Sequence, residues 1–429
     1  MHQTISDQDR PFGIWTAAAL VVGLMVGVGI YSLPAQLADY GWTGIAAWLI
    51  AGTGTLACVL ALVRLVAVRP GEGSLMAICG SVLGEKIGVM ISWSYWVSLW
   101  CGNAVAATVV AEYGAGIIPG FEPSPFQAGL IGSGVLAVIS LLNLGGLREA
   151  GRTQVILTTL KILPLFAVLL MLAGLILSPH GHFSGLPLAP MRVAGLNPAV
   201  TMAFFALVGF ECAGMVAERV RDPAKNIVRA TLLGMVGTAL VYMALCTGII
   251  AALPRAQLVA SPAPLELFAG AMWGNWAAFS VAIFAAISGL GMMNAQTLLL
   301  GELPLGLVRA KQLPRFIAPT NGKDIAALPL IIGNGLAILL LLGSATAVGA
   351  DLLAFLLKLT TAVSLWLYVG TCMAALRLRL AKIWAVIGTA FCLWVLYGAG
   401  LEAGGLAIGL MLAGLPLYWL ALRFSPKPA

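Results

Sequence analysis

The segment LMVGVGIYSLP, residues 24–34, places two glycines and a proline inside a stretch that is apolar enough to cross a membrane. Gly27 and Gly29 flank Val28 near the middle of that stretch, and Pro34 follows. Within a bilayer, non-helical backbone is tolerated only where it lines a cavity or is buried in protein, because an unsatisfied backbone group is costly there. The segment therefore predicts a transmembrane helix that is interrupted at the glycines, next to a cavity.

The composition around this segment is that of an integral membrane protein. Of the 429 residues, 61% are hydrophobic and only 9% are charged, whereas soluble domains carry roughly 25% charged residues. The apolar segments have the length of about 20 residues typical of a spanning helix, rather than the roughly 10 residues of a strand in an outer-membrane barrel. The polar N-terminal sequence MHQTISDQDRPF leads into an apolar run too long for a signal peptide, so we expect no cleavable signal.

Twelve transmembrane helices are predicted from the apolar segments and from the Pro- and Gly-rich connections between them. The expected spans are 12–38, 42–67, 87–117, 127–145, 155–177, 198–217, 228–252, 274–303, 326–343, 351–376, 383–400 and 404–422. Nothing between or beyond them resembles a soluble domain, so residues 1–429 are expected to form a single transmembrane domain.

The distribution of lysine and arginine supports this number of spans. With the N-terminus in the cytoplasm, nineteen of the 23 basic residues fall on the cytoplasmic side, Arg192 and Arg255 fall outside, and Lys161 and Lys358 fall within spans. Cytoplasmic loops carry such an excess of positive charge. We therefore expect a multi-pass protein of the cytoplasmic (inner) membrane with both termini in the cytoplasm. The net charge of +7 then reflects topology, and nucleic acid is not an expected partner.

Several classes of function are disfavoured by what the spans lack. None of the seven cysteines shows CxxC spacing, and none of the three histidines lies in a span, so we expect neither a metal site nor a cofactor. An intramembrane enzyme would need a cluster of catalytic side chains at membrane depth, and none is present, so the chain is not expected to be an enzyme. Primary transport driven by ATP is disfavoured because the sequence has no GxxxxGK[ST] motif.

A second interrupted span is predicted in the other half of the chain. ALVGFE, residues 206–211, matches LMVGVG, residues 24–29, and lies five spans later, so its orientation is reversed. Paired interrupted helices in inverted repeats are the best sequence indication of a transporter's binding site. Close helix packing explains most of the 51 glycines, but it requires no such counterpart. The half-helix N-terminus beyond a break carries N–H donors and partial positive charge, which suit a carboxylate.

Three segments are informative together: GVGIYSLPAQLADYGW (27–42), RPGEGSLMAICGSVLGEKIGVMISWSYWVSLWCGNAVA (69–106) and FFALVGFECAGMVAERVRDPAKNIVRA (204–230). They resemble segments of the amino acid–polyamine–organocation transporters, including the bacterial arginine/agmatine antiporters. The resemblance implies an all-α polytopic membrane protein with twelve transmembrane helices. It further implies a five-plus-five inverted repeat in which helices one and six are broken. Repeat one would cover about 12–177 and repeat two about 198–376, with accessory helices at about 383–422.

The resemblance also implies a central site between helices one, three, six, eight and ten. The backbone of helix one would hold the substrate's carboxylate and the backbone of helix six its α-ammonium. The expected substrate-binding residues are Gly27, Val28, Gly29, Ile30, Ser98, Asn103, Phe205, Ala206, Val208, Gly209 and Gln296.

Two of these positions depart from the arginine antiporters. Phe205 lies where those proteins have a gating tryptophan, and Gln296 lies where they have a tryptophan that stacks on guanidinium, whereas Asn103 matches their helix-three asparagine. Because position 296 is a glutamine and has no aromatic face, it cannot bind the arginine guanidinium by a cation–π contact. The sequence therefore weakens the expectation of arginine as the substrate.

Charged residues inside the spans are candidates for coupling. Lys161 matches a lysine that, in sodium-independent relatives, lies where sodium-coupled relatives bind sodium; the alternative is that it snorkels to the cytoplasmic face. Glu211 is expected either to carry a proton or to cap the unwound segment. Lys358 either repels cationic substrates or snorkels to the outer interface. The basic runs at 219–229 and 309–323 are interpreted as topogenic loops that contact anionic lipid.

The function expected from these features is secondary active transport of amino acids or related amines by alternating access. It would be sodium-independent and would proceed by proton symport or by substrate exchange, so small molecules and protons are the expected partners besides membrane lipid. An arginine/agmatine-type antiporter is the alternative within this class, and a substrate sensor or channel is the alternative from another class. The sequence does not decide whether the protein takes up or exports its substrate, or whether it forms a homodimer.

Overall fold

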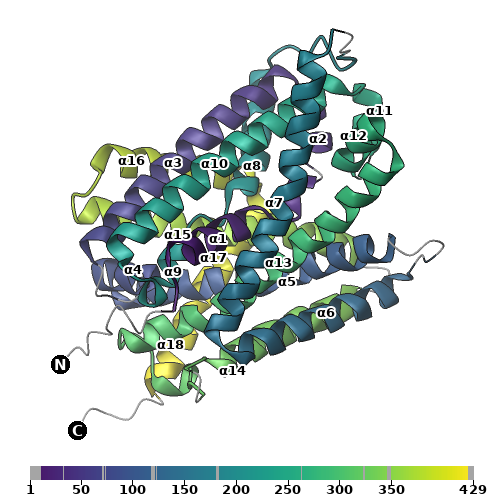
Figure 1. Cartoon of the computed structure of the whole chain (residues 1–429). Coiled ribbons are helices and arrows are strands. Elements are labelled where there is room, and N and C mark those ends of the chain that lie inside the picture. Colours follow the sequence, from purple (N-terminus) through teal and green to yellow (C-terminus); the bar gives the residue numbers. More distant parts are fainter. Residues whose placement is uncertain are drawn as a thin grey trace.

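The computed structural model describes residues 11–423 except 32, 70, 71, 73, 117–120, 122, 180–182, 262, 322–323 and 345–348. In these residues the chain is helical, and its only extended pairings are two isolated β-bridges (Figure 1). The expectation of an all-α polytopic membrane protein is confirmed. The three histidines and the side chain of Lys358 lie outside the described part, so the expectations about them stay as they were.

The helices of the first half run from α1 to α7. They are α1 (Ile14–Met25), α2 (Leu33–Leu37), α3 (Trp42–Val68), α4 (Leu75–Leu83), α5 (Glu85–Gly116), α6 (Pro125–Gly145) and α7 (Leu147–Leu177). The helices of the second half are α8 (Leu196–Leu207), α9 (Cys212–Met215), α10 (Pro223–Ala252), α11 (Arg255–Ala260), α12 (Pro264–Trp273), α13 (Asn275–Arg309), α14 (Ala327–Ser344), α15 (Gly349–Arg377), α16 (Lys382–Gly398), α17 (Leu401–Leu412) and α18 (Gly414–Arg423). Short 3₁₀ turns include η2 (Gly29–Tyr31) and η5 (Ala217–Arg219).

The predicted spans agree with these helices over most of the chain. Six of the described helices are each long and apolar enough to cross a membrane, and three shorter apolar helices add to them. Span eleven agrees with α16, and a bend of 119° separates α16 from α17. Span twelve differs from its prediction, because α17 and α18 divide it into two helices. Gly400, at the bend, adopts a φ of 94°, which glycine tolerates and other residues rarely do. The total of twelve spans stays a prediction.

The two interruptions predicted in helices one and six are confirmed. Helix one stops at Met25 and resumes at the η2 turn, and helix six stops at Leu207 and resumes at α9. Gly209 adopts a φ of +117°, and a Cβ added there would lie 2.9 Å from the backbone nitrogen of Met25. Only glycine therefore lets the two interrupted backbones approach so closely.

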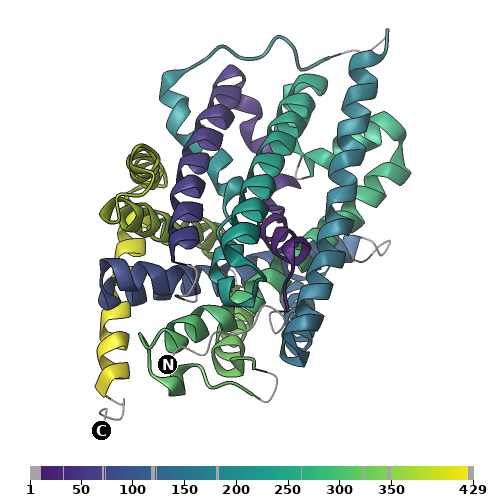
Figure 2. The same ribbon diagram turned by 60° about the vertical axis from the view of Figure 1, so that its left-hand side comes forward.

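Long helices surround the breaks and hold them in the protein core. α1 packs on α7, α10 and α13, while α8 packs on α3 and α16. α5 runs against both α13 and α15 and closes the remaining side. Figure 2 shows that the loop between α13 and α14 and the end of α18 lie at the same end of the bundle. The distribution of basic residues predicts that this end faces the cytoplasm.

Candidate functional site

A cavity of about 420 Å³ lies beside the two helix breaks. Nine of the eleven predicted binding residues line it: Gly27, Val28, Gly29, Ile30, Ser98, Phe205, Ala206, Val208 and Gln296. Gly209 lies behind the lining, against α1, and Asn103 also lies outside it. Among the described residues, no aspartate, glutamate, lysine, arginine or histidine lines the cavity. A bound molecule would therefore meet no formally charged side chain in this described lining, but only the partial charges of the backbone and of polar side chains such as Tyr95, Ser98 and Gln296.

The carbonyl groups released by the first break are held by side chains from neighbouring helices. The Tyr242 hydroxyl of α10 donates to the Met25 carbonyl at 3.1 Å. The Ser288 hydroxyl of α13 lies 3.1 Å from the carbonyl of Val26 and 3.2 Å from that of Gly27. These donors satisfy acceptors that have lost their helical partners. These hydrogen bonds fix the orientation of the carbonyl groups at the break. The N–H groups of the next turn belong to the opposite side of the break.

Lys161 of α7 lies inside the protein and not at the membrane surface. Its side chain is fully buried, and its ammonium donates to the Gly23 carbonyl in the last turns of α1. One turn earlier on α7, the Thr158 hydroxyl donates to the Ala19 carbonyl at 3.0 Å. The C-terminal end of a helix carries partial negative charge, which favours a cation. The structure thus places the Lys161 ammonium at the first break, where its partner is backbone.

Glu211 forms the corresponding support for the second break. It is fully buried and accepts the backbone N–H of Gly209 at 3.1 Å and the Tyr368 hydroxyl at 2.8 Å. A third donor is the hydroxyl of Tyr95, a residue that also lines the cavity. The carboxylate therefore caps the unwound segment, which is one of the two roles expected from the sequence, and Tyr95 connects it to the cavity. Proton transfer by Glu211 stays a prediction.

Helix α5 presents Gly102 to the cavity in place of Asn103. The Asn103 amide donates to Asn334 Oδ1 at 2.8 Å and to Thr297 Oγ1 at 3.2 Å, so this side chain is directed toward α14. Because Gly102 has no side chain, it leaves room for Gln296: a Cβ on Gly102 would lie 2.7 Å from the Gln296 Nε2. Gln296 Oε1 is buried and has no hydrogen-bond partner among the described residues.

The sequence model of the family described as "Amino acid permease" matches residues 12–412, which is nearly the whole chain. The chain belongs to the amino acid permease family. It is similar to the cadaverine/lysine antiporter of Escherichia coli (strain K12), with 25% identity over 411 residues that cover 91% of this chain and 90% of the relative. It is also similar to the arginine/agmatine antiporter of Chlamydia trachomatis serovar L2, with 24% identity over 439 residues that cover 95% and 89% of the two chains.

Several residues that line the permease's cavity were not expected from the sequence. They are Gln36, Tyr95, Tyr113, Thr201, Met292, Thr360, Thr361 and Ser364, among others. Helical spacing could have indicated Met292, which lies four residues before the predicted binding residue Gln296, because residues so spaced share a face. Tyr113 and Thr201 carry no such signal, because nothing in the local pattern shows which way an isolated polar residue of a span points.

Proposed function

We propose that this permease is a secondary active transporter that carries amino acids or related amines across the cytoplasmic membrane by alternating access. The observation that carries the proposal is the cavity bounded by both helix breaks. Family membership and the names of the two relatives support the same class of cargo. The distribution of basic residues supports a cytoplasmic location of both termini, and the proposal includes membrane lipid around the helices and no enzymatic role.

The helix ends at the breaks supply the two charges that an amino acid requires. The N–H groups of residues 28–30 begin the turn that follows the first break, where a helix carries partial positive charge, and they receive the carboxylate. The carbonyl groups of Phe205 and Ala206 lie at the C-terminal end of α8, where the partial charge is negative, and they receive the α-ammonium. Phe205 also lies next to Gly29, since a Cβ added to that glycine would be 3.6 Å from the phenylalanine ring.

The lining of the cavity favours neutral amino acids over basic ones. A guanidinium or a second ammonium would find no carboxylate among the described lining residues, and a buried charge without a partner is strongly disfavoured. Gln296 Oε1 is a buried acceptor without a partner among the described residues, and it can receive one hydrogen bond from a substrate without supplying a counter-charge. The second candidate is exchange of a basic amino acid for its amine, and it is favoured by the names of both relatives.

A thermal-shift screen of the purified protein against the standard amino acids and polyamines separates these candidates. A ligand present at a hundred times its Kd stabilises the folded state by about 2.7 kcal/mol. We expect at least one neutral amino acid to raise the melting temperature and arginine to compete with it roughly tenfold more weakly. Strong competition by arginine would favour the second candidate. If no amino acid or amine binds, and none is transported in proteoliposomes, the proposed function is wrong.

Coupling is assigned to Glu211 and Lys161, with proton symport or substrate exchange and without sodium. The Lys161 amine at the end of α1 lies beside the first break, where its protonated form supplies the positive charge that a sodium ion would otherwise provide. Glu211 supplies a carboxylate that Tyr95 connects to the cavity. A change in the protonation of Glu211 would therefore alter the hydrogen bonds that hold the second break.

Replacing Glu211 with glutamine is expected to abolish the pH dependence of uptake and to preserve substrate binding. Glutamine keeps the size of the side chain and an oxygen that can accept the Gly209 N–H, but it does not titrate in this range. Uptake of a labelled substrate into proteoliposomes across a pH series measures the effect. Tyr368→Phe is the control, because it removes one hydrogen bond to Glu211 and keeps the carboxylate. An unchanged pH profile in Glu211→Gln would exclude Glu211 as the proton carrier.

A further inference from the structure

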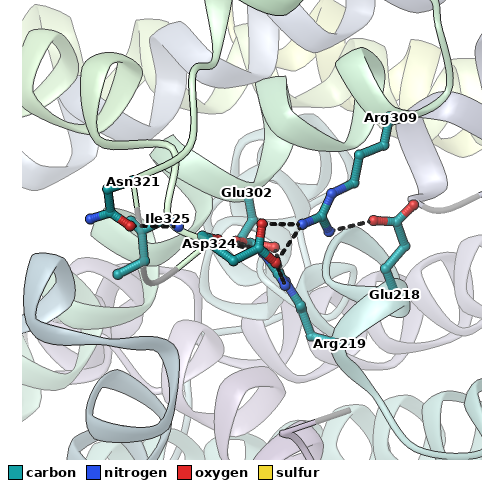
Figure 3. Close-up of polar contacts among 7 residues, drawn as sticks. All are labelled: Glu218, Arg219, Glu302, Arg309, Asn321, Asp324 and Ile325. Atoms are coloured by element: carbon teal, nitrogen blue, oxygen red, sulfur yellow. Dashed lines mark hydrogen bonds and ion pairs between the residues drawn. The ribbon is translucent and has the colours of Figure 1, made fainter. Parts of the chain in front are cut away.

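Five charged side chains form a network next to the inner half of broken helix six, at the end of the bundle opposite the outer part of the cavity. Figure 3 shows them: Glu218, Arg219, Glu302, Arg309 and Asp324. None of them lines the cavity. The exposed fractions of the Arg219 and Glu302 side chains are only 7% and 6%, so this pair is largely removed from water. Such burial distinguishes it from the ordinary charges of a topogenic loop.

Arg219 is the centre of the network. Its Nε lies 2.8 Å from Glu302 Oε2 and its Nη2 lies 3.0 Å from Glu302 Oε1, which is a two-pronged contact with the carboxylate. The same guanidinium donates to Asp324 Oδ2 at 2.5 Å and to the Asp324 carbonyl at 2.9 Å. Four hydrogen bonds to two residues fix the orientation of this side chain.

Arg309 extends the network on its more exposed side. It donates to the two carboxylate oxygens of Asp324 at 2.8 and 2.7 Å and to Glu218 Oε2 at 2.7 Å. Positive and negative charges therefore alternate from Glu302 through Arg219, Asp324 and Arg309 to Glu218 (Figure 3). Asp324, which is shared by both arginines, has an exposed side-chain fraction of 54%, so water screens this half of the network more than the Arg219–Glu302 pair.

The network fastens both broken helices to α13. Arg219 belongs to the η5 turn, directly after α9, whereas Glu302 and Arg309 belong to α13. The segment before α1 is attached to the same turn, because the Phe12 N–H donates to the Arg219 carbonyl at 2.9 Å and the Arg221 N–H donates to the Phe12 carbonyl at 2.8 Å. The inner ends of helices one and six are thus held against α13 through one turn of chain.

The cavity lies on the other side of the breaks. Beyond them it is lined by residues near the outer ends of their spans, among them Gln36, Tyr113, Thr201 and Ala399. Toward the cytoplasm, the hydrogen bonds of Glu211 and the four residues of α9, all of them buried, separate the cavity from the network. A substrate that leaves toward the cytoplasm must pass this region, so α9 must move away from α13.

We propose that Arg219 and its two acidic partners are a latch that holds the permease closed toward the cytoplasm, and that Arg219 must leave Glu302 and Asp324 before the cavity can open inward. The role of the latch in transport rests on the proposed function. The opening that the latch controls does not depend on that function, because the latch sets how often the inner half of helix six separates from α13. Removing one partner of a buried ion pair leaves a charge without compensation, so it raises the frequency of opening.

The negative charge of Asp324 persists from mildly acidic to neutral pH. Burial acts to raise the pKa of Asp324, but the hydrogen bond and charge of Arg219, together with Arg309, outweigh it and hold this pKa below its ordinary value. The contribution of Asp324 is therefore present above about pH 4 and is lost only as the pH falls through its lowered pKa. Glu302 and Glu218 face the same two arginines. Titration of Asp324 therefore does not release this part of the latch in the neutral range.

The native thiol of Cys212 reports on this opening. Cys212 begins α9 and is fully buried in the present state. In membrane vesicles of known orientation, a membrane-impermeant thiol reagent is added from the cytoplasmic side, and mass spectrometry follows modification of the peptide that contains Cys212. We expect Arg219→Gln to raise the rate of modification on the order of tenfold, because Glu302 is left buried without its partner. Arg152→Gln, in an exposed pair with Glu149, is the control and should not change the rate.

Two further variants protect the test against misfolding. Arg219→Gln combined with Glu302→Gln removes both charges and leaves no buried charge unpaired, and it too should raise the rate of Cys212 modification. Arg219→Lys keeps a positive charge beside both Glu302 and Asp324, and it should keep the rate near that of the unmodified protein. Modification at the unmodified rate in both Arg219→Gln and the double glutamine variant would overturn the proposal. Because this measurement needs no substrate, a protein that fails to transport amino acids can still support the latch.

Discussion

Replacing Gly27 with leucine is expected to lower the affinity for amino acids on the order of a hundredfold. Gly27 lines the cavity within the first break, and a Cβ added there would lie 2.6 Å from the sulfur of Met292. The end of a methionine side chain can move for one methyl group, so Gly27→Ala should reduce affinity only slightly. A leucine side chain extends further and occupies the space that we assign to the carboxylate. Isothermal titration with the best ligand of the thermal-shift screen measures both variants.

Gly237→Leu is the matched control for adding a leucine to a spanning helix. Gly237 belongs to α10, lies on its exposed face and has open space around the position of a Cβ. We expect this variant to bind with the affinity of the unmodified protein. Unchanged affinity in Gly27→Leu would show that the first break is not where the substrate binds.

Replacing Lys161 with alanine is expected to abolish pH-dependent uptake. The change removes a fully buried ammonium and leaves the Gly23 carbonyl without its side-chain donor. It also empties space next to Gly291, where a Cβ would lie 3.0 Å from the ammonium nitrogen. An unsatisfied buried acceptor costs about 1–3 kcal/mol, and a cavity adds to that cost, so the variant should also be less stable. Uptake into proteoliposomes over a pH series and the melting temperature are measured together.

Lys161→Met separates the charge from the packing. Methionine fills much of the same space and carries no ammonium, so it should preserve more of the melting temperature than alanine does. We expect it to lose pH-dependent uptake all the same. Full pH-dependent uptake in either Lys161 variant would contradict a coupling role for this residue. A loss of uptake that only followed a loss of folded protein would show that the role of Lys161 is structural.

The helix breaks could be predicted from the sequence because their cause is local. Glycines at mid-span have a cost in a bilayer that only a cavity or a buried turn removes, and the counterpart at residues 206–211 identified the second break. The direction of Asn103 could not be predicted in this way. It and Gly102 are neighbours on one helix, about 100° apart around its axis, and the rotation of α5 against α13 decides which of them faces the cavity.

The Arg219 network also could not be predicted from the sequence. The sequence pattern indicates only topogenic charges for Arg219 and Arg309, because both lie in basic runs near span ends. The ion pairs that form the network join residues far apart in the chain, such as Arg219 with Glu302 and with Asp324. Charge counts report on which side of the membrane a loop lies, whereas burial of a particular pair depends on how α9 and α13 pack together.

Exchange across proteoliposome membranes tests the central claim most directly. Vesicles that contain the purified protein are loaded with an unlabelled amino acid from the thermal-shift screen and diluted into a trace of the same labelled amino acid, without sodium. The account predicts that label accumulates inside the vesicles and that Gly27→Leu, but not Gly237→Leu, abolishes the accumulation. Absence of accumulation for every amino acid and amine tested, or accumulation that survives in Gly27→Leu, would contradict it.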